Sequence, residues 1–437
     1  MNMQPRTASD GARAVPYRRF DSWLLDAGYA AFLLLIFVTL SPLAARDAAT
    51  LAAHAGEGDV LRQIAFLSVF AVIVGCALWT RGFAALRAVP IMLAVTLVWC
   101  LASALWSIEP DVTLRRVVLA VVIVVSAMVA VDSVGAERAL RMWRVLLIGI
   151  LVANWVSVFI LPEAVHLPGD SETDVIGDWR GLYVHKNIAG AVSAMSAIVF
   201  LFSALGTKRW SDWLLFAGSI GFLIMTQSKS SMGFLGLAIL AGAFYRLIGR
   251  GGLDRMIGVV AAALLLVVGG GFAVANWDAI AHLLQDPMQF TGRAAIWQAE
   301  ARYIGDHPLL GAGFGSFADT GARSPLYSYM GEKWIGTISH GHSGYLELAV
   351  TVGLIGFALA MIALIVQPLI EFARAATRQT LFTTLTFTLF IFVVLHNVME
   401  SDFLEGDAPQ WVAFLMAIAM VRGHQRETGT REAERWP

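Results

Sequence analysis

The residues best suited to chemistry lie in one hydrophilic stretch, residues 277–344, which contains Arg293, Trp297, His307, His340 and His342 among several glycines. A guanidinium group presents a fork of N–H donors that matches phosphate oxygens and keeps its charge, so Arg293 is predicted to bind a pyrophosphate group. A neutral imidazole accepts a proton readily near neutral pH, so His342 is predicted to deprotonate a hydroxyl group. For His342 and His340, the alternative is a hydrogen bond at the start of a helix.

A second group of polar residues lies in segment 162–187, directly before an apolar run. A helix that starts at Asn187 would be capped by this residue and would offer free N–H groups with a partial positive charge. With Arg180 and Lys186 beside them, these groups predict a phosphate site. The alternative is that both cations pair with acids of the same segment or with lipid headgroups. His185 is more typical of a hydrogen-bonded interfacial residue than of a catalyst.

Two further polar positions lie between apolar runs. Lys229 lies in the turn Thr226–Ser231, where it either binds a diphosphate or extends along the membrane surface as a lysine flanked by serines. Asn397 and Glu400 follow another apolar run, and they either support the residues named above or cap the helix.

The sequence predicts neither a metal nor a cofactor. His340 and His342 lack a third ligand with a defined spacing, and both cysteines, Cys76 and Cys100, lie in apolar runs. The glycines of segment 311–315 follow no strand, so they are predicted to form a tight turn rather than a nucleotide-binding loop.

Composition indicates the elements that must position these residues. The chain is 58% hydrophobic and only 14% charged, and its mean hydropathy is +0.69. Such a chain is predicted to be an all-α polytopic membrane protein, because lipid offers the backbone no hydrogen-bond partner. About twelve apolar runs are long enough to be predicted as membrane-spanning helices. They are 23–44, 61–80, 88–106, 117–131, 145–161, 188–205, 212–226, 231–248, 256–276, 345–368, 380–396 and 409–421.

The distribution of basic residues predicts the orientation. Most of the 31 lysines and arginines fall in loops on the side of the N-terminus, which predicts that both termini are cytoplasmic. The predicted organisation is a cytoplasmic tail (1–22), nine spans (23–276), a large periplasmic loop with an amphipathic helix over 291–304 (277–344), three spans (345–421) and a second cytoplasmic tail (422–437). Trp297 of that helix is interpreted as an anchor at the membrane interface. The net charge of −1 is a sum over two unlike faces and gives no indication of nucleic-acid binding.

The order of these motifs over about residues 90–405 resembles the O-antigen ligase and Wzy-type polymerase family, and most closely its ExoQ-like exopolysaccharide polymerases. The motifs are Trp106–Pro110, Trp179–Gly181, His185–Asn187, Gln227–Ser230, Gly292–Arg293 with Trp297, His307–Gly313 and His342–Leu346. The resemblance implies twelve spans in the bacterial inner membrane and metal-independent transfer of a glycan from an undecaprenyl diphosphate carrier. It also implies that Arg180, Lys186, Lys229 and Arg293 bind the donor and that His342 lies nearest the acceptor. Lys229 stands where many relatives carry arginine.

The acceptor distinguishes the activities within this family. A second lipid-linked repeat unit makes the protein a polymerase, which we favour, and lipid A-core makes it a ligase. Attack by the acceptor hydroxyl would invert the anomeric centre, and a chain-length regulator and a flippase are expected partners. A glycan transporter would also have about twelve spans, but transporters place charges near the membrane midplane, whereas these spans are nearly free of ionisable residues. A non-catalytic assembly subunit is the third alternative.

Overall fold

The computed structural model describes residues 17–40, 42–43, 60–167, 175–278, 293–318, 320, 323–330 and 341–433. These residues form helices and no strand, as predicted for an all-α protein. The helices are α1 (Tyr17–Phe37), α3 (Val60–Arg81), α4 (Ile91–Ala102), α5 (Pro110–Val134), α6 (Ala136–Ile160), α7 (Lys186–Thr207), α8 (Trp210–Met225), α9 (Lys229–Arg250), α10 (Gly252–Ala275), α12 (Arg293–Asp306), α13 (Leu326–Met330), α14 (Gly344–Met361), α15 (Gln367–Ala375), α16 (Leu381–His396) and α17 (Pro409–Ala433).

Several helices are suited to cross a membrane. Seven helical stretches of the described chain are long and apolar enough to do so, and four shorter apolar helices accompany them. These helices confirm a polytopic membrane protein, while the total of twelve spans stays a prediction. The predicted span 88–106 is shorter than expected, because a 3-10 helix (Gly82–Ala88) and Pro90 precede α4 and a second 3-10 turn (Ser103–Leu105) follows it.

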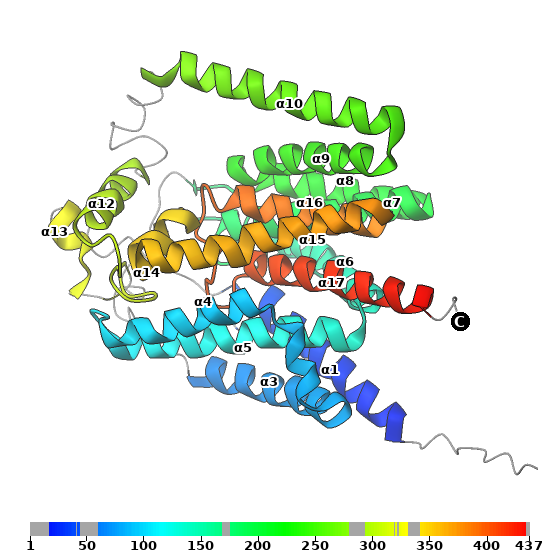
Figure 1. Cartoon of the computed structure of the whole chain (residues 1–437), viewed down its shortest axis with the longest axis horizontal. Coiled ribbons are helices and arrows are strands. Elements are labelled where there is room, and N and C mark those ends of the chain that lie inside the picture. Colours follow the sequence, from blue (N-terminus) through cyan, green and yellow to red (C-terminus); the bar gives the residue numbers. More distant parts are fainter. Residues whose placement is uncertain are drawn as a thin grey trace, which may run out of the picture.

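Burial separates the core of the bundle from its periphery. In its most apolar part α7 is 78% buried, whereas the corresponding part of α10 is 6% buried and contacts α9. Figure 1 shows α10 at the edge of the bundle, with α9 as its neighbour. Helix α1 begins, and α17 ends, at the end of the bundle opposite α12 (Figure 1). We call the end that carries α12 and α13 the α12 end.

The glycine run 311–315 attaches the segment after α12 to the bundle. Gly311, Gly313 and Gly315 have positive φ, as the predicted tight turn requires. Helix α14 bends at Gly353 (φ 67°), where a Cβ atom would lie 2.1 Å from the carbonyl oxygen of Leu309. Backbone N–H groups of Ala312 and Gly313 donate to carbonyls of the same bend. The bend of α14 therefore creates the space into which residues 309–313 pack.

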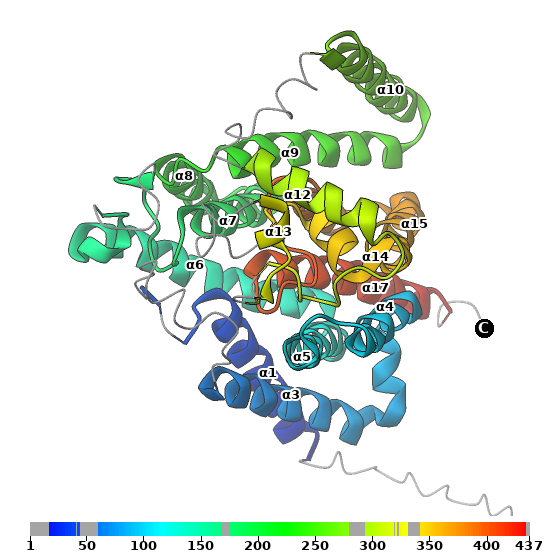
Figure 2. The same cartoon turned by 90° about the vertical axis from the view of Figure 1, so that its left-hand side faces the viewer.

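Helix α12 confirms the predicted helix in the long loop, although its partner differs from the expected one. Ala299 and Tyr303 pack against Phe317 and Val350, so its apolar face lies on protein rather than on a membrane surface. Figure 2, which faces the α12 end, shows α12 and α13 beside α14. This packing carries Arg293, at the start of α12, to the ends of the spanning helices.

Candidate functional site

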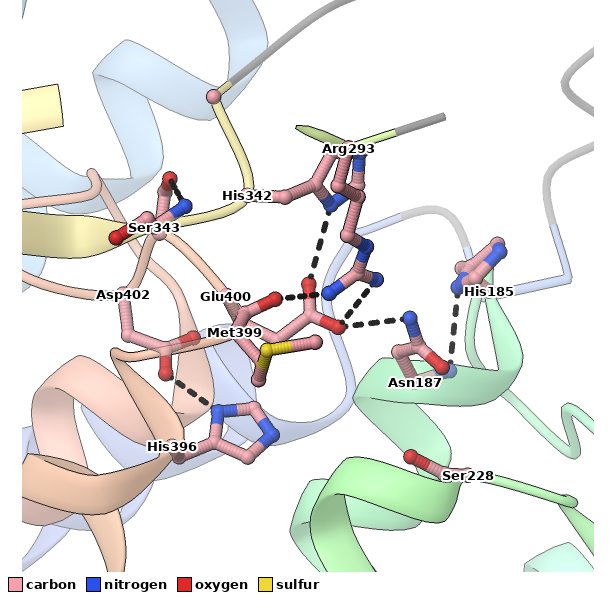
Figure 3. A network of polar contacts seen from close by, with 12 residues as sticks. His185, Asn187, Ser228, Arg293, His342, Ser343, His396, Met399, Glu400 and Asp402 are labelled. Carbon is pink, nitrogen blue, oxygen red and sulfur yellow. Dashed lines mark hydrogen bonds and ion pairs between the residues drawn. The ribbon is translucent and has the colours of Figure 1, made fainter. Parts of the chain in front are cut away.

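Three distant segments converge on the carboxylate of Glu400, which lies in the turn after α16. Arg293 Nη2 donates to Glu400 Oε1 at 2.9 Å, and Asn187 Nδ2 donates to the same oxygen at 2.8 Å. His342 Nδ1 lies 3.4 Å from Glu400 Oε2 (Figure 3). The site thus joins the first residues of α7 and α12 to the segment that precedes α14.

The charge of Glu400 is stabilised by these neighbours. Burial alone would raise the pKa of this carboxyl, but the hydrogen bond with His342 and the charge of Arg293 hold the pKa well below 4.5. The side chains of Arg293 and Glu400 are 12% and 10% exposed, so water screens the pair only weakly. Arg293 Nη1 also donates to the carbonyl of Met399. These contacts fix the guanidinium while using only part of its five N–H donors.

His342 is held in an uncommon backbone conformation. Its φ of 53° lies in the left-handed region, which costs a non-glycine residue about 1 kcal/mol or more. The following residues are tied to the turn that contains Glu400: Ser343 N donates to Ser401 Oγ at 3.1 Å, and Gly344 N donates to the carbonyls of Asn397 and Glu400 at 2.9 Å each. When Nδ1 carries the proton and donates to Glu400, Nε2 is the basic nitrogen of His342.

A buried polar network lies beneath these residues. Ser228 Oγ donates to Ser231 Oγ at 3.0 Å, Ser231 Oγ lies 3.3 Å from His396 Nε2, and His396 Nδ1 lies 2.6 Å from Asp402 Oδ2. The side-chain oxygen of Asn397 accepts from the N–H groups of Asp402 and Phe403. Asn397 therefore closes the turn, while Glu400 contacts the two predicted catalytic residues.

The start of α7 differs from the prediction. The N-cap is His185, whose Nδ1 accepts from Asn187 N at 3.1 Å, and Lys186 N donates to His166 Nε2 at 3.2 Å. The prediction that Asn187 caps this helix was wrong, because its amide reaches Glu400 instead. The predicted free N–H groups of Lys186 and Asn187 are likewise engaged by the two imidazoles. No local pattern indicated His166, because it lies twenty residues before Lys186 in the chain.

The two predicted cations of segment 162–187 contact that segment itself. Lys186 Nζ lies 2.6 Å from Asp178 Oδ2, and both side chains are largely buried. Arg180 is 4% exposed and donates to the carbonyls of Glu163 and Val184 at 2.6 and 3.3 Å. Lys186 thus pairs with an acid of its own segment, as the alternative expected, whereas these contacts of Arg180 are with backbone carbonyls.

Lys229 is the first residue of α9, and it is exposed. Its helix starts against the first turn of α7, since a Cβ atom on Gly190 would lie 2.5 Å from Ser228 Cβ. Ser228 is the N-cap of α9, but its side chain makes no capping hydrogen bond. Within the described part of the chain, the Lys229 ammonium has neither a hydrogen bond nor an ion pair. The start of α9, which carries the positive charge of Lys229, therefore packs against the N-terminal part of α7.

His307 and His340 are the other two histidines that the sequence singled out in this part of the chain. His307 stacks on Tyr303, with ring centroids 4.4 Å apart, at the end of α12 far along the helix from Arg293. His340 lies outside the described residues. Across the described ranges, no group of three or more His, Cys, Asp or Glu side chains is arranged to hold a metal ion.

The bundle and its site define a multi-pass membrane protein with a buried polar site where the ends of several helices meet. Residues 213–361 match the family model described as O-antigen ligase. This region is therefore similar to the O-antigen ligase and Wzy-type polymerase family, which points to glycosyl transfer between a lipid-linked glycan and an acceptor. The matched residues include Lys229, Arg293 and His342, whereas Asn187 and Glu400 lie outside them. No curated protein matches this chain significantly.

Proposed function

We propose that this protein transfers a glycan from an undecaprenyl diphosphate carrier to a sugar hydroxyl at the periplasmic face of the bacterial inner membrane. The observation that carries the proposal is the convergence of Arg293, His342 and Asn187 on Glu400, beside the start of α9. This arrangement combines a cation suited to a diphosphate with an imidazole suited to a hydroxyl group.

The donor diphosphate binds between Arg293 and the start of α9. The exposed Lys229 and the uncapped N–H groups of α9 supply positive charge on one side, and the guanidinium held by Glu400 supplies it on the other. Arg180 and Lys186, by contrast, act by holding segment 162–187 in place. Positive charge at the diphosphate stabilises the negative charge that develops as the glycosidic bond breaks, so departure needs no acid catalyst.

His342 acts as the general base. The acceptor hydroxyl gives its proton to Nε2 while its oxygen forms a bond to the anomeric carbon, and the bond from that carbon to the diphosphate breaks. Undecaprenyl diphosphate leaves with the electron pair, and the anomeric centre inverts. Glu400 stabilises the imidazolium that forms, as a buried carboxylate does for a catalytic histidine in other enzymes. His342 later returns its proton to water.

We favour a polymerase, whose acceptor is a second lipid-linked repeat unit, and the ligase that uses lipid A-core is the alternative. A chain-length regulator and a flippase are its proposed partners, and no metal or cofactor takes part. Both termini are proposed to be cytoplasmic. The positions of the start of α1 and the end of α17, opposite the α12 end, support this orientation.

Reconstitution in lipid nanodiscs tests the proposal. Purified protein with a lipid-linked oligosaccharide should release undecaprenyl diphosphate and form a longer glycan, and both Arg293→Ala and His342→Ala should lose this activity while remaining folded. A transporter would leave the glycan on its carrier, and an assembly subunit would keep cellular transfer intact after either substitution. Either outcome would reject the proposal. In cells that lack the protein, accumulated single repeats indicate a polymerase and long unattached chains a ligase.

A further inference from the structure

The backbone of Gly341, the residue before His342, is held by hydrogen bonds on both sides. The indole Nε1 of Trp297 donates to the carbonyl of Gly341 at 3.1 Å, and Gly341 N donates to Glu347 Oε2 at 3.1 Å. Trp297 belongs to α12 and Glu347 to the first turn of α14. Two helices therefore fix the carbonyl and the N–H group of one residue. We call these two hydrogen bonds the Gly341 clamp.

His342 needs such support because its backbone is strained. Its positive φ is unfavourable for a side chain with a Cβ atom, and a strained residue persists only where its surroundings determine its conformation. Ser343 and Gly344 are tied to the turn of Glu400 on one side of His342. The Gly341 clamp supplies the matching restraint on the other side, so the imidazole is directed toward Glu400.

Glu300 fills the space beneath the clamp. Its side chain is fully buried, and neither carboxyl oxygen has a hydrogen-bond partner among the residues that the structure describes. A Cβ atom at position 341 would lie 1.9 Å from Glu300 Oε1 and 2.9 Å from Glu347 Oε2, so a larger residue there would displace the Glu300 carboxyl group. Burial, and then the negative charge of Glu347, raise the pKa of Glu300 well above 4.5, which favours its neutral form. A neutral Glu300 packs against Gly341 without placing a second charge next to Glu347.

We propose that Trp297 and Glu347 are positioning residues, which act on glycan transfer by orienting the His342 imidazole through the backbone of Gly341. This inference rests on the proposed role of His342. Arg293 and Trp297 lie one turn apart on α12, so the helix that presents the donor-binding guanidinium also holds the base. Neither Trp297 nor Glu347 contacts the reacting atoms. Their removal therefore slows the chemical step and leaves donor binding intact.

Steady-state kinetics of the full-length protein in nanodiscs test this role. Trp297→Phe keeps the aromatic ring but removes the N–H donor, and it should lower kcat about five- to tenfold, the factor expected for one ordinary hydrogen bond, with the donor KM unchanged. Glu347→Ala should have a similar effect, and Glu347→Gln should restore activity because its carbonyl oxygen still accepts from Gly341 N. The double variant Trp297→Phe/Glu347→Ala should lose less than the product of the two factors, because both side chains hold the same residue, Gly341.

Trp106→Phe is the matched control, since Trp106 Nε1 donates to the carbonyl of Leu310 at 3.0 Å, away from Gly341. Its kcat should equal that of the unsubstituted protein. The positioning role of Trp297 and Glu347 is rejected if Trp297→Phe behaves like this control, if only the donor KM rises, or if the effects of the two substitutions are fully additive in the double variant. Should His342→Ala retain transfer, the proposed function itself fails. Loss of transfer in His342→Ala with no effect of Trp297→Phe would overturn the clamp alone.

Discussion

Glu400→Gln removes the negative charge that holds Arg293 and His342 together. Glutamine keeps the size of the side chain and one oxygen for the Asn187 amide, so the change is mainly electrostatic. Hydrogen bonds to charged groups contribute about 1.5–3 kcal/mol each, and the substitution weakens two of them in a site where both partners of the ion pair are at most 12% exposed. We therefore expect a loss of about 3 kcal/mol, which corresponds to a roughly 100-fold fall in kcat/KM if it is expressed in the reaction barrier.

The same contacts should make stability depend on pH with a defined sign. The pKa of Glu400 is lower in the folded protein than its ordinary value of 4.5. The ionised carboxylate therefore contributes stability above pH 4.5, and this contribution is lost as pH falls toward the folded-state pKa. Melting temperatures should differ most between the unsubstituted protein and Glu400→Gln near neutral pH, and the difference should shrink below about pH 4.

The control is Glu109→Gln, which breaks an ion pair to an arginine, Arg323, whose side chain is 74% exposed. Exposed pairs contribute little, so transfer and melting temperature should barely change. Equal activity of Glu400→Gln and Glu109→Gln in the nanodisc assay would refute the reasoning, and so would a Glu400→Gln melting difference that does not vary with pH.

Three further predictions follow from individual contacts. Lys229→Ala should raise the donor KM about tenfold with little change in kcat. The control is Lys208→Ala at the C-terminal end of α7, away from the site, which should change neither constant. A fall in kcat alone for Lys229→Ala would contradict a binding role. Glu300→Gln should raise the melting temperature more at pH 8 than at pH 5. The folded protein keeps Glu300 protonated, and taking up this proton on folding costs more free energy as the pH rises above 4.5. A difference in melting temperature that does not change with pH would indicate an ionised Glu300. Gly344→Ala should sharply reduce the yield of monodisperse protein by size-exclusion chromatography, since its Cβ would lie 2.0 Å from Asn397 Oδ1; a normal yield would show that the turn can shift.

Much of the fold could be predicted from local patterns. Apolar runs of membrane length give helices because a backbone in lipid satisfies its hydrogen bonds only within the helix, and α5, α6, α7 and α9 confirm this. The helix that begins at Arg293 was predicted from its spacing of apolar residues. The bend of α14 at Gly353 was not, because it depends on the Leu309 carbonyl, a contact more than forty residues away in the chain.

In the candidate site, too, residue type predicted some features and only the fold revealed others. Residue chemistry alone selected Arg293, Lys229 and His342, because permanent charge and imidazole basicity belong to the side chain wherever it lies. Sequence placed Asn187 as a helix cap, whereas the structure gives that role to His185 and directs the Asn187 amide to Glu400.

The sequence by itself thus determined that the chain forms a helical membrane protein and which side chains are chemically competent. Only the tertiary structure decided that Glu400 joins Arg293, Asn187 and His342, and that Arg180 and Lys186 are bound within their own segment. The physical reason is that hydropathy and helix propensity act between neighbours in the chain. An ion pair or a hydrogen bond across the bundle depends instead on how helices pack, which no local pattern specifies.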